Sequence, residues 1–116
     1  FALERVFEKL FEDIKANTEG REGIERLEQM IFAALPLEAC GIPGWQVWIA
    51  FLGYSVGRQH LVQEHRKRYD LLSKIICEEL ADLQVAKLIR DDVDLKLEAN
   101  ALIALVDGIG TGVVIN

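Results

Sequence analysis

The stretch WQVWIAFLGYS, residues 45–55, is apolar on nearly every side when it is drawn as a helix. A helix without a polar stripe either lies at the centre of a core or wraps around a cavity. The stretch also carries aromatic side chains at Trp45, Trp48, Phe51 and Tyr54. It therefore predicts a central helix, against which the segments on both sides must pack.

Two amphipathic segments precede this central helix. Apolar residues recur at steps of three and four over residues 2–17, which predicts a first helix. Its stripe consists of Leu3, Val6, Phe7, Leu10, Phe11 and Ile14. After the turn residues 17–20, a second stripe runs from Ile24 to Leu35, where Pro36 ends the helix. Residues 36–44 hold two prolines and two glycines, so we expect a loop leading into the central helix.

Two further helices are predicted after residue 55. Gly57 marks a bend, and the stripe that follows predicts a helix of about 25 residues, or about 38 Å. This stripe consists of Leu61, His65, Leu72, Ile76, Leu80 and Leu83. Residues 87–92 break the pattern, and Asp94 offers a side-chain acceptor to the first amides of a last helix from about Leu95. No alternating strand pattern and no internal repeat is visible, so we expect an all-α helical bundle forming one domain over residues 1–116.

Composition and charge limit the classes of function. The net charge is −6 and the pI is about 4.9, whereas proteins hold nucleic-acid backbones through clustered Lys and Arg. This segment alone should not bind DNA. The apolar opening of the chain is broken at once by Glu4 and Arg5, and no run of 18 uninterrupted apolar residues exists, so we expect a cytoplasmic protein without a membrane segment. Cys40 and Cys77 are expected to be reduced thiols.

Catalytic and metal-binding patterns are missing from the sequence. His60 and His65 are five residues apart, about 140° around a helix, whereas ligands of one metal on a helix usually lie three or four apart. The glycines of residues 108–112 follow a helical pattern instead of a strand, which argues against a phosphate-binding loop. No nucleophile with a base and an orienting acid stands out. We expect no enzyme activity, no cofactor and no metal.

Aromatic and polar residues of the central and fourth helices suggest a small-molecule site. Binding pockets are mostly apolar with a few polar groups, and ring faces attract cations, so a hydrophobic or cationic ligand would suit these residues. The predicted ligand-binding residues are Trp45, Trp48, Phe51, Tyr54, His65 and Tyr69. The alternative is that the same side chains form a solid aromatic core.

Small residues follow one face of the last helix, where another helix can approach closely. The approach would be either internal packing or a symmetric dimer. The predicted dimer-interface residues are Ala101, Ala104, Leu105, Gly108 and Gly112. Asp107 interrupts the apolar run beside them, and the sequence leaves open whether it faces solvent or is buried with a partner.

Several stretches resemble the C-terminal regulatory region of TetR-type transcription regulators, nearest the group that includes the choline-responsive BetI repressors. They are residues 45–55, HLVQEHRKRYDLLSKII at 60–76, the acidic turn at 90–94, and above all ANALIALVDGIGTGVVIN at 99–116. The resemblance implies a ligand-sensing and dimerising domain that controls an N-terminal helix-turn-helix head. It also implies that the head and the final helix of the dimer bundle are absent here, since the chain begins with Phe and stops within an apolar run.

The expected function is therefore that of a regulatory domain of a TetR-type repressor. It would bind a small-molecule effector, form a homodimer, and contact DNA only through the absent head. The alternative from another class is a helical protein–protein interaction module that has a solid aromatic core and no small-molecule ligand.

Overall fold

The computed structural model describes residues 2–115, and within them the chain is helical without any strand. The elements are α1 (Ala2–Thr18), α2 (Gly23–Ala34), a short 3₁₀ turn η1 (Ala39–Gly41), α3 (Ile42–Ser55), α4 (Gln59–Val85) and α5 (Leu95–Ile115). The all-α prediction is confirmed, and the five predicted helices are found in their predicted order. One start differs, because α3 begins three residues before Trp45 and takes Pro43 into its first turn, where no amide donor is needed.

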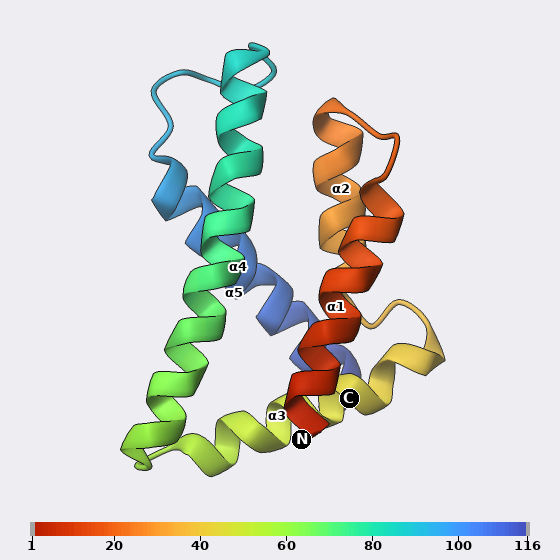
Figure 1. Ribbon diagram of the computed structural model, residues 1–116, viewed down its shortest axis with the longest axis vertical. Coiled ribbons are helices and arrows are strands. Elements are labelled where there is room, and N and C mark those ends of the chain that lie inside the picture. The colour runs from red at the N-terminus through yellow and green to blue at the C-terminus, as the bar shows by residue number, and fades with distance from the viewer. Residues whose placement is uncertain (1, 116) are drawn as a thin grey trace.

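The helices form two hairpins that share a base (Figure 1). α1 packs along α2, and α4 packs along α5, while α2 and α4 touch each other only sparingly. α3 crosses the foot of both hairpins and contacts α1, α4 and α5. The start of α1 and the end of α5 both lie near α3 (Figure 1). α3 is thus the central element that its apolar sequence predicted.

Two clusters of buried side chains hold the hairpins and α3 together. The first joins α1 to α3 through Leu3, Phe7 and Trp48, with the Phe7 and Trp48 rings edge to face at 5.4 Å between centroids. The second joins α4 to α5 through Leu80, Leu83 and Ala99. Each large apolar side chain that is fully buried contributes about 1.5–3 kcal/mol to the stability of the fold. The clusters lie at opposite ends of the molecule, and the space between them is not filled by either.

The helix ends follow the chemistry of the connecting residues. Gly57 has φ +78° between α3 and α4, a left-handed conformation that costs glycine little, and it produces the predicted bend. At the start of α5 the Leu97 amide donates to the Asp94 carboxylate at 3.1 Å, so the predicted cap is confirmed. These ends set the directions of α4 and α5, and therefore which of their residues contact α3.

Candidate functional site

A cavity of about 350 Å³ lies between the two core clusters and is lined by residues from all five helices and η1. Its walls are mainly aliphatic: Val6, Leu10, Ile14, Met30, Ile31, Leu72, Ile76, Leu102, Ile103 and Val106 contribute. The volume falls within the range of about 300–1,000 Å³ that small-molecule sites occupy. The cavity exists because the amphipathic stripes of α1, α2, α4 and α5 converge on α3 without closing on one another.

The six residues predicted to bind a ligand occupy three different places. Trp45, Trp48 and Tyr69 line the cavity. His65 and Phe51 stand beside Trp48, with ring centroids 5.3 and 5.9 Å from it, and are not part of the cavity wall. Three of the six side chains are thus brought to the cavity, and two pack against one of those three.

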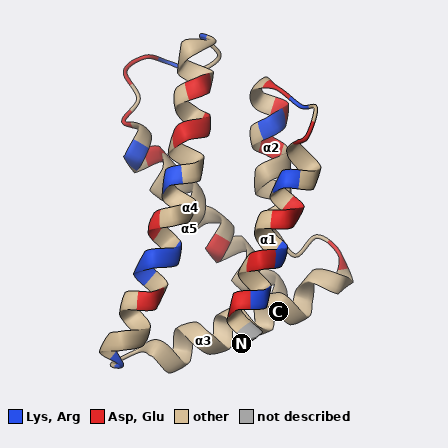
Figure 2. Cartoon of the chain, in the orientation of Figure 1, with Lys and Arg blue, Asp and Glu red and all other residues tan. Residues whose placement is uncertain are grey.

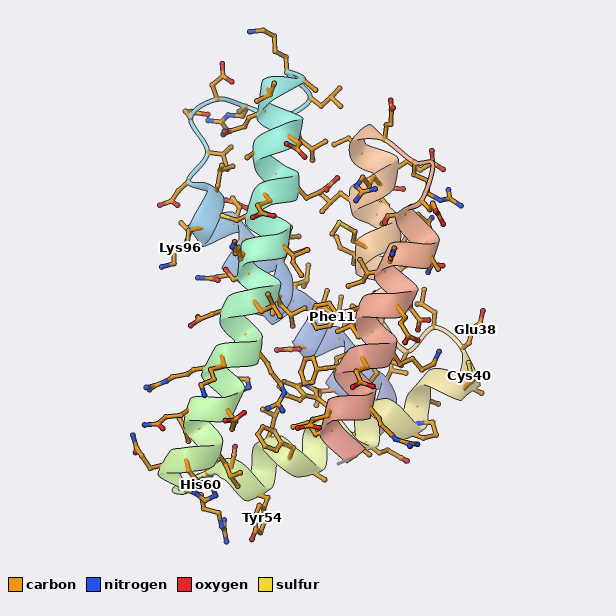
Figure 3. All side chains as sticks on the ribbon, in the orientation of Figure 1. Phe11, Glu38, Cys40, Tyr54, His60 and Lys96 are labelled. Carbon is orange, nitrogen blue, oxygen red and sulfur yellow. The ribbon has the colours of Figure 1, made fainter. Side chains whose placement is uncertain are left out.

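Tyr54 lies away from the cavity. Its side chain is 62% exposed, and the Arg58 guanidinium covers its ring at 4.0 Å from the centroid. Figure 3 shows Tyr54 at the foot of the molecule, pointing outward from α3. The apolar sequence of α3 gave no indication of which of its aromatic residues face inward.

Asp107 is the polar residue that the sequence left undecided, and it lines the cavity. Burial raises the pKa of this carboxyl above its ordinary value of 3.8, while the neighbouring Trp48 side chain partly offsets the rise. Within residues 2–115 no Lys, Arg or His forms an ion pair with it. Asp107 is therefore a half-buried acid whose negative charge lacks a cationic partner among the described residues.

Two titratable neighbours share this environment. Burial, and then the Asp107 carboxylate, raise the pKa of the Tyr69 phenol. Burial, and then Arg66 and Arg68, lower the pKa of His65. The His65 Nδ1 atom is buried without a hydrogen-bond partner. The surroundings therefore favour a neutral Tyr69 beside the Asp107 carboxyl, and a neutral His65 behind Trp48 and Tyr69.

Trp45 is fixed in the cavity wall from two sides. Its indole nitrogen donates a hydrogen bond to the Ala34 carbonyl oxygen at 3.0 Å, at the end of α2. On the other side Gly110 of α5 lies against the ring, and a Cβ atom at that position would overlap the indole. One side chain thus joins the end of α2, the start of α3 and the last turns of α5.

The outer face of α5 carries the predicted dimer-interface residues. Ala101, Ala104, Leu105 and Gly108 are exposed and Gly112 is half-buried, while the buried residues of α5 are Ala99, Ile103 and Gly110. A Cβ atom at Gly108 would meet nothing within 4 Å. The small-residue stripe therefore does not serve packing within the described chain. Ile109 and Val113, exposed by 47% and 51%, extend the apolar face.

Other chemistry on the described residues is sparse. No group of three or more His, Cys, Asp or Glu side chains in this part of the chain is placed to hold a metal ion. Cys40 is exposed and Cys77 half-buried, and both thiols are free. By length and composition alone, α5 is apolar enough to cross a membrane, a test that the core helix of a soluble protein also passes.

Comparison with known proteins identifies the family of this fold and cavity. No curated protein matches the chain at a significant level. Residues 23–116 match the family described as BetI-type transcriptional repressor, C-terminal. The match covers α2 to α5 and every part of the cavity wall except α1. It confirms the resemblance seen in the sequence, and the chain belongs to the C-terminal domain family of BetI-type transcriptional repressors, a branch of the TetR class.

Proposed function

We propose that this chain is the effector-sensing and dimerisation domain of a TetR-type repressor. The observation that carries the proposal is the apolar cavity of about 350 Å³ with the unpaired carboxyl of Asp107 in its wall. A half-buried acid that has the Trp48 side chain beside it but no cationic partner costs folding stability, so its presence in a cavity favours a binding role over a structural one. The proposed place of action is the cytoplasm, in contact with DNA only through a separate helix-turn-helix head.

The chemistry of the walls favours a hydrophobic effector that carries a cationic group. Aliphatic side chains from four helices would enclose its apolar part. In the same wall Asp107 supplies a negative charge, and the rings of Trp45, Trp48 and Tyr69 supply faces that attract cations. Arg5 and Lys9 of α1 also line the cavity, and Lys9 is paired with Asp13. A bound cation would also give the Asp107 carboxylate the partner that the chain does not provide.

The effector would act through α1. Val6, Phe7 and Leu10 of α1 line the cavity, so a ligand that changes its width would move α1 relative to α3. The start of α1 lies at the α3 end of the molecule, from which a preceding head would be reached (Figure 1). Such control requires that the effector bind the DNA-released state more tightly than the DNA-bound state, by about 1–3 kcal/mol in typical allosteric proteins.

The proposed dimer forms through the outer face of α5. Ala101, Ala104 and Gly108 would let a second helix approach closely, and Leu105 would be buried between the two. Burial in a dimer would remove from water an apolar face that the described chain leaves uncovered. We propose that this contact between subunits, and not a membrane, covers the exposed apolar face of α5.

The experiment that tests the sensor function uses the two tryptophans of the cavity wall. A panel of hydrophobic and cationic metabolites is screened for shifts in Trp emission and in melting temperature. A ligand at 100 times its Kd should stabilise the chain by about 2.7 kcal/mol. Asp107→Asn should weaken a cationic ligand, whereas Tyr54→Phe, outside the cavity, should bind it as the original chain does.

The rival function, a protein–protein interaction module, rests on a solid aromatic core. The cavity between the two core clusters is the observation that disfavours it. If the whole panel left both Trp emission and melting temperature unchanged, the sensor function would be contradicted and the interaction module would take its place.

A further inference from the structure

A single polar contact joins the two hairpins at the end of the molecule opposite α3. Of the six ion pairs among the described residues, five connect residues no more than four positions apart. The exception is Arg26 of α2 with Glu79 of α4, whose Nε and Oε2 atoms are 3.1 Å apart. α2 and α4 otherwise touch sparingly, and Leu27 of α2 packs against the Leu80–Leu83–Ala99 cluster, so this pair is the polar part of a small contact between the hairpins.

The Arg26 guanidinium binds three helices at once. Besides Glu79, it donates to the carbonyl oxygen of Thr18 at 3.0 Å, in the last turn of α1. The Thr18 hydroxyl in turn donates to the carbonyl oxygen of Ile14, one turn earlier in α1. Arg26 thus holds a helix end whose last side chain is already hydrogen-bonded. The contact therefore ties the α1–α2 hairpin as a unit to α4.

Glu79 makes the contact sensitive to the loss of Arg26. Glu79 is only 8% exposed, and a carboxylate that is removed from water needs a partner for its charge. Arg21 also lines the open cavity of about 520 Å³ beside the pair, but it is paired with Glu25, and Glu22 and Asp82 in the same wall are acidic. Acidic residues are prominent on the upper part of α4 in Figure 2. Without Arg26 the Glu79 charge would be relieved by water entering between α2 and α4.

We propose that Arg26 and Glu79 form a latch that holds the two hairpins together and so controls access to the effector cavity. The cavity lies between the same hairpins, with Leu10 and Met30 on one side and Leu72 and Leu102 on the other. Separation of α2 from α4 widens the gap above it, while α3 keeps the hairpins joined at the foot. This inference adds a point of regulation to the proposed sensor, but the latch itself is a property of the chain without ligand.

The test measures the distance between the hairpins directly. Nitroxide labels are placed on exposed positions of α2 and α4 through Glu28→Cys and Lys74→Cys, in a chain with Cys40→Ser and Cys77→Ala. Double electron–electron resonance should give one distance population for the original latch. Arg26→Met should add a second population of molecules in which the two labels lie farther apart. This population should be on the order of tenfold larger than any such population in the original chain. Acrylamide quenching of the cavity tryptophans should rise with it.

Two further variants separate a latch from a simple loss of stability. Arg26→Met with Glu79→Met removes both charges, and since no unpaired carboxylate is then left at the buried position 79, the single short distance should return. Lys67→Met removes the cation of an exposed pair within α4 and should change nothing. An unchanged distance distribution in a folded Arg26→Met chain would overturn the latch, whatever the outcome of the effector screen. So would a double variant that stays open.

Discussion

Two glycines of α5, two residues apart, have opposite surroundings. At Gly110 a Cβ atom would overlap the Trp45 indole, so the ring of α3 lies directly against the backbone of α5 at this position. At Gly108 the same atom would meet nothing. One glycine is therefore required by packing within the chain, whereas nothing in the described chain requires the other.

The matched pair Gly110→Ala and Gly108→Ala tests this difference. Gly110→Ala should lower the free energy of unfolding by about 1–3 kcal/mol, because the Trp45 ring must move from its place against α5. Gly108→Ala should raise it by up to about 1 kcal/mol, since alanine favours the helix. Urea denaturation of the two variants checks both, and equal effects would contradict the close crossing.

Asp107 gives the stability of the chain a pH dependence. Its pKa is raised in the folded state, so the folded chain holds this proton more tightly than the unfolded chain does. The original chain should therefore lose stability relative to Asp107→Asn as the pH rises from near 3.8 through the raised value. Urea denaturation at pH 4.5 and pH 7.5 measures this. Asp107→Asn should be the more stable chain at pH 7.5, and the difference in free energy of unfolding should shrink at pH 4.5. An equal difference at both pH values would count against burial of the charge.

At the scale of elements, the periodic helices were predictable and their mutual placement was not. The stripes of α1 and α4 predicted which faces turn inward, and Asp94 and Gly57 marked ends that the structure confirms. The stripe of α2 did so only in part, because Ile24 is 41% exposed and the buried residue of α2 is Met30. α3 is apolar all round, so its sequence could not distinguish Trp48, which is buried, from Tyr54, which is exposed. The cavity is lined by all five helices, so its existence depends on the distances between them. The periodicity of a sequence gives the inward face of a helix but not these distances.

The outer face of α5 leads to a prediction about association. Gly108→Leu should hold a partner helix away and shift the chain to monomers in sedimentation equilibrium. Gly53→Leu is the matched control, because Gly53 is also an exposed helical glycine with nothing near its Cβ position, on α3 instead of α5. Dimers of unchanged affinity in Gly108→Leu would place the interface elsewhere.

For the whole molecule, the net charge decides what the chain does alone. With a charge of −6, it lacks the excess of cations that displaces counterions from a nucleic acid. Fluorescence anisotropy with a labelled duplex at about 150 mM salt should show no binding tighter than about 10⁻⁴ M, the weak end of non-specific binding. Salt-dependent binding below that value would contradict this expectation.

Asp107 and Gly108 are neighbours in the chain, yet the first lines the cavity and the second lies on the open face of α5. The proposed effector and the proposed second subunit therefore act on two different faces of one helical turn. If ligand changes how tightly subunits associate, association must change ligand affinity by the same factor. Effector titrations at low and high protein concentration would then have different midpoints, and the cellular amount of the repressor would itself set the effector level to which it responds.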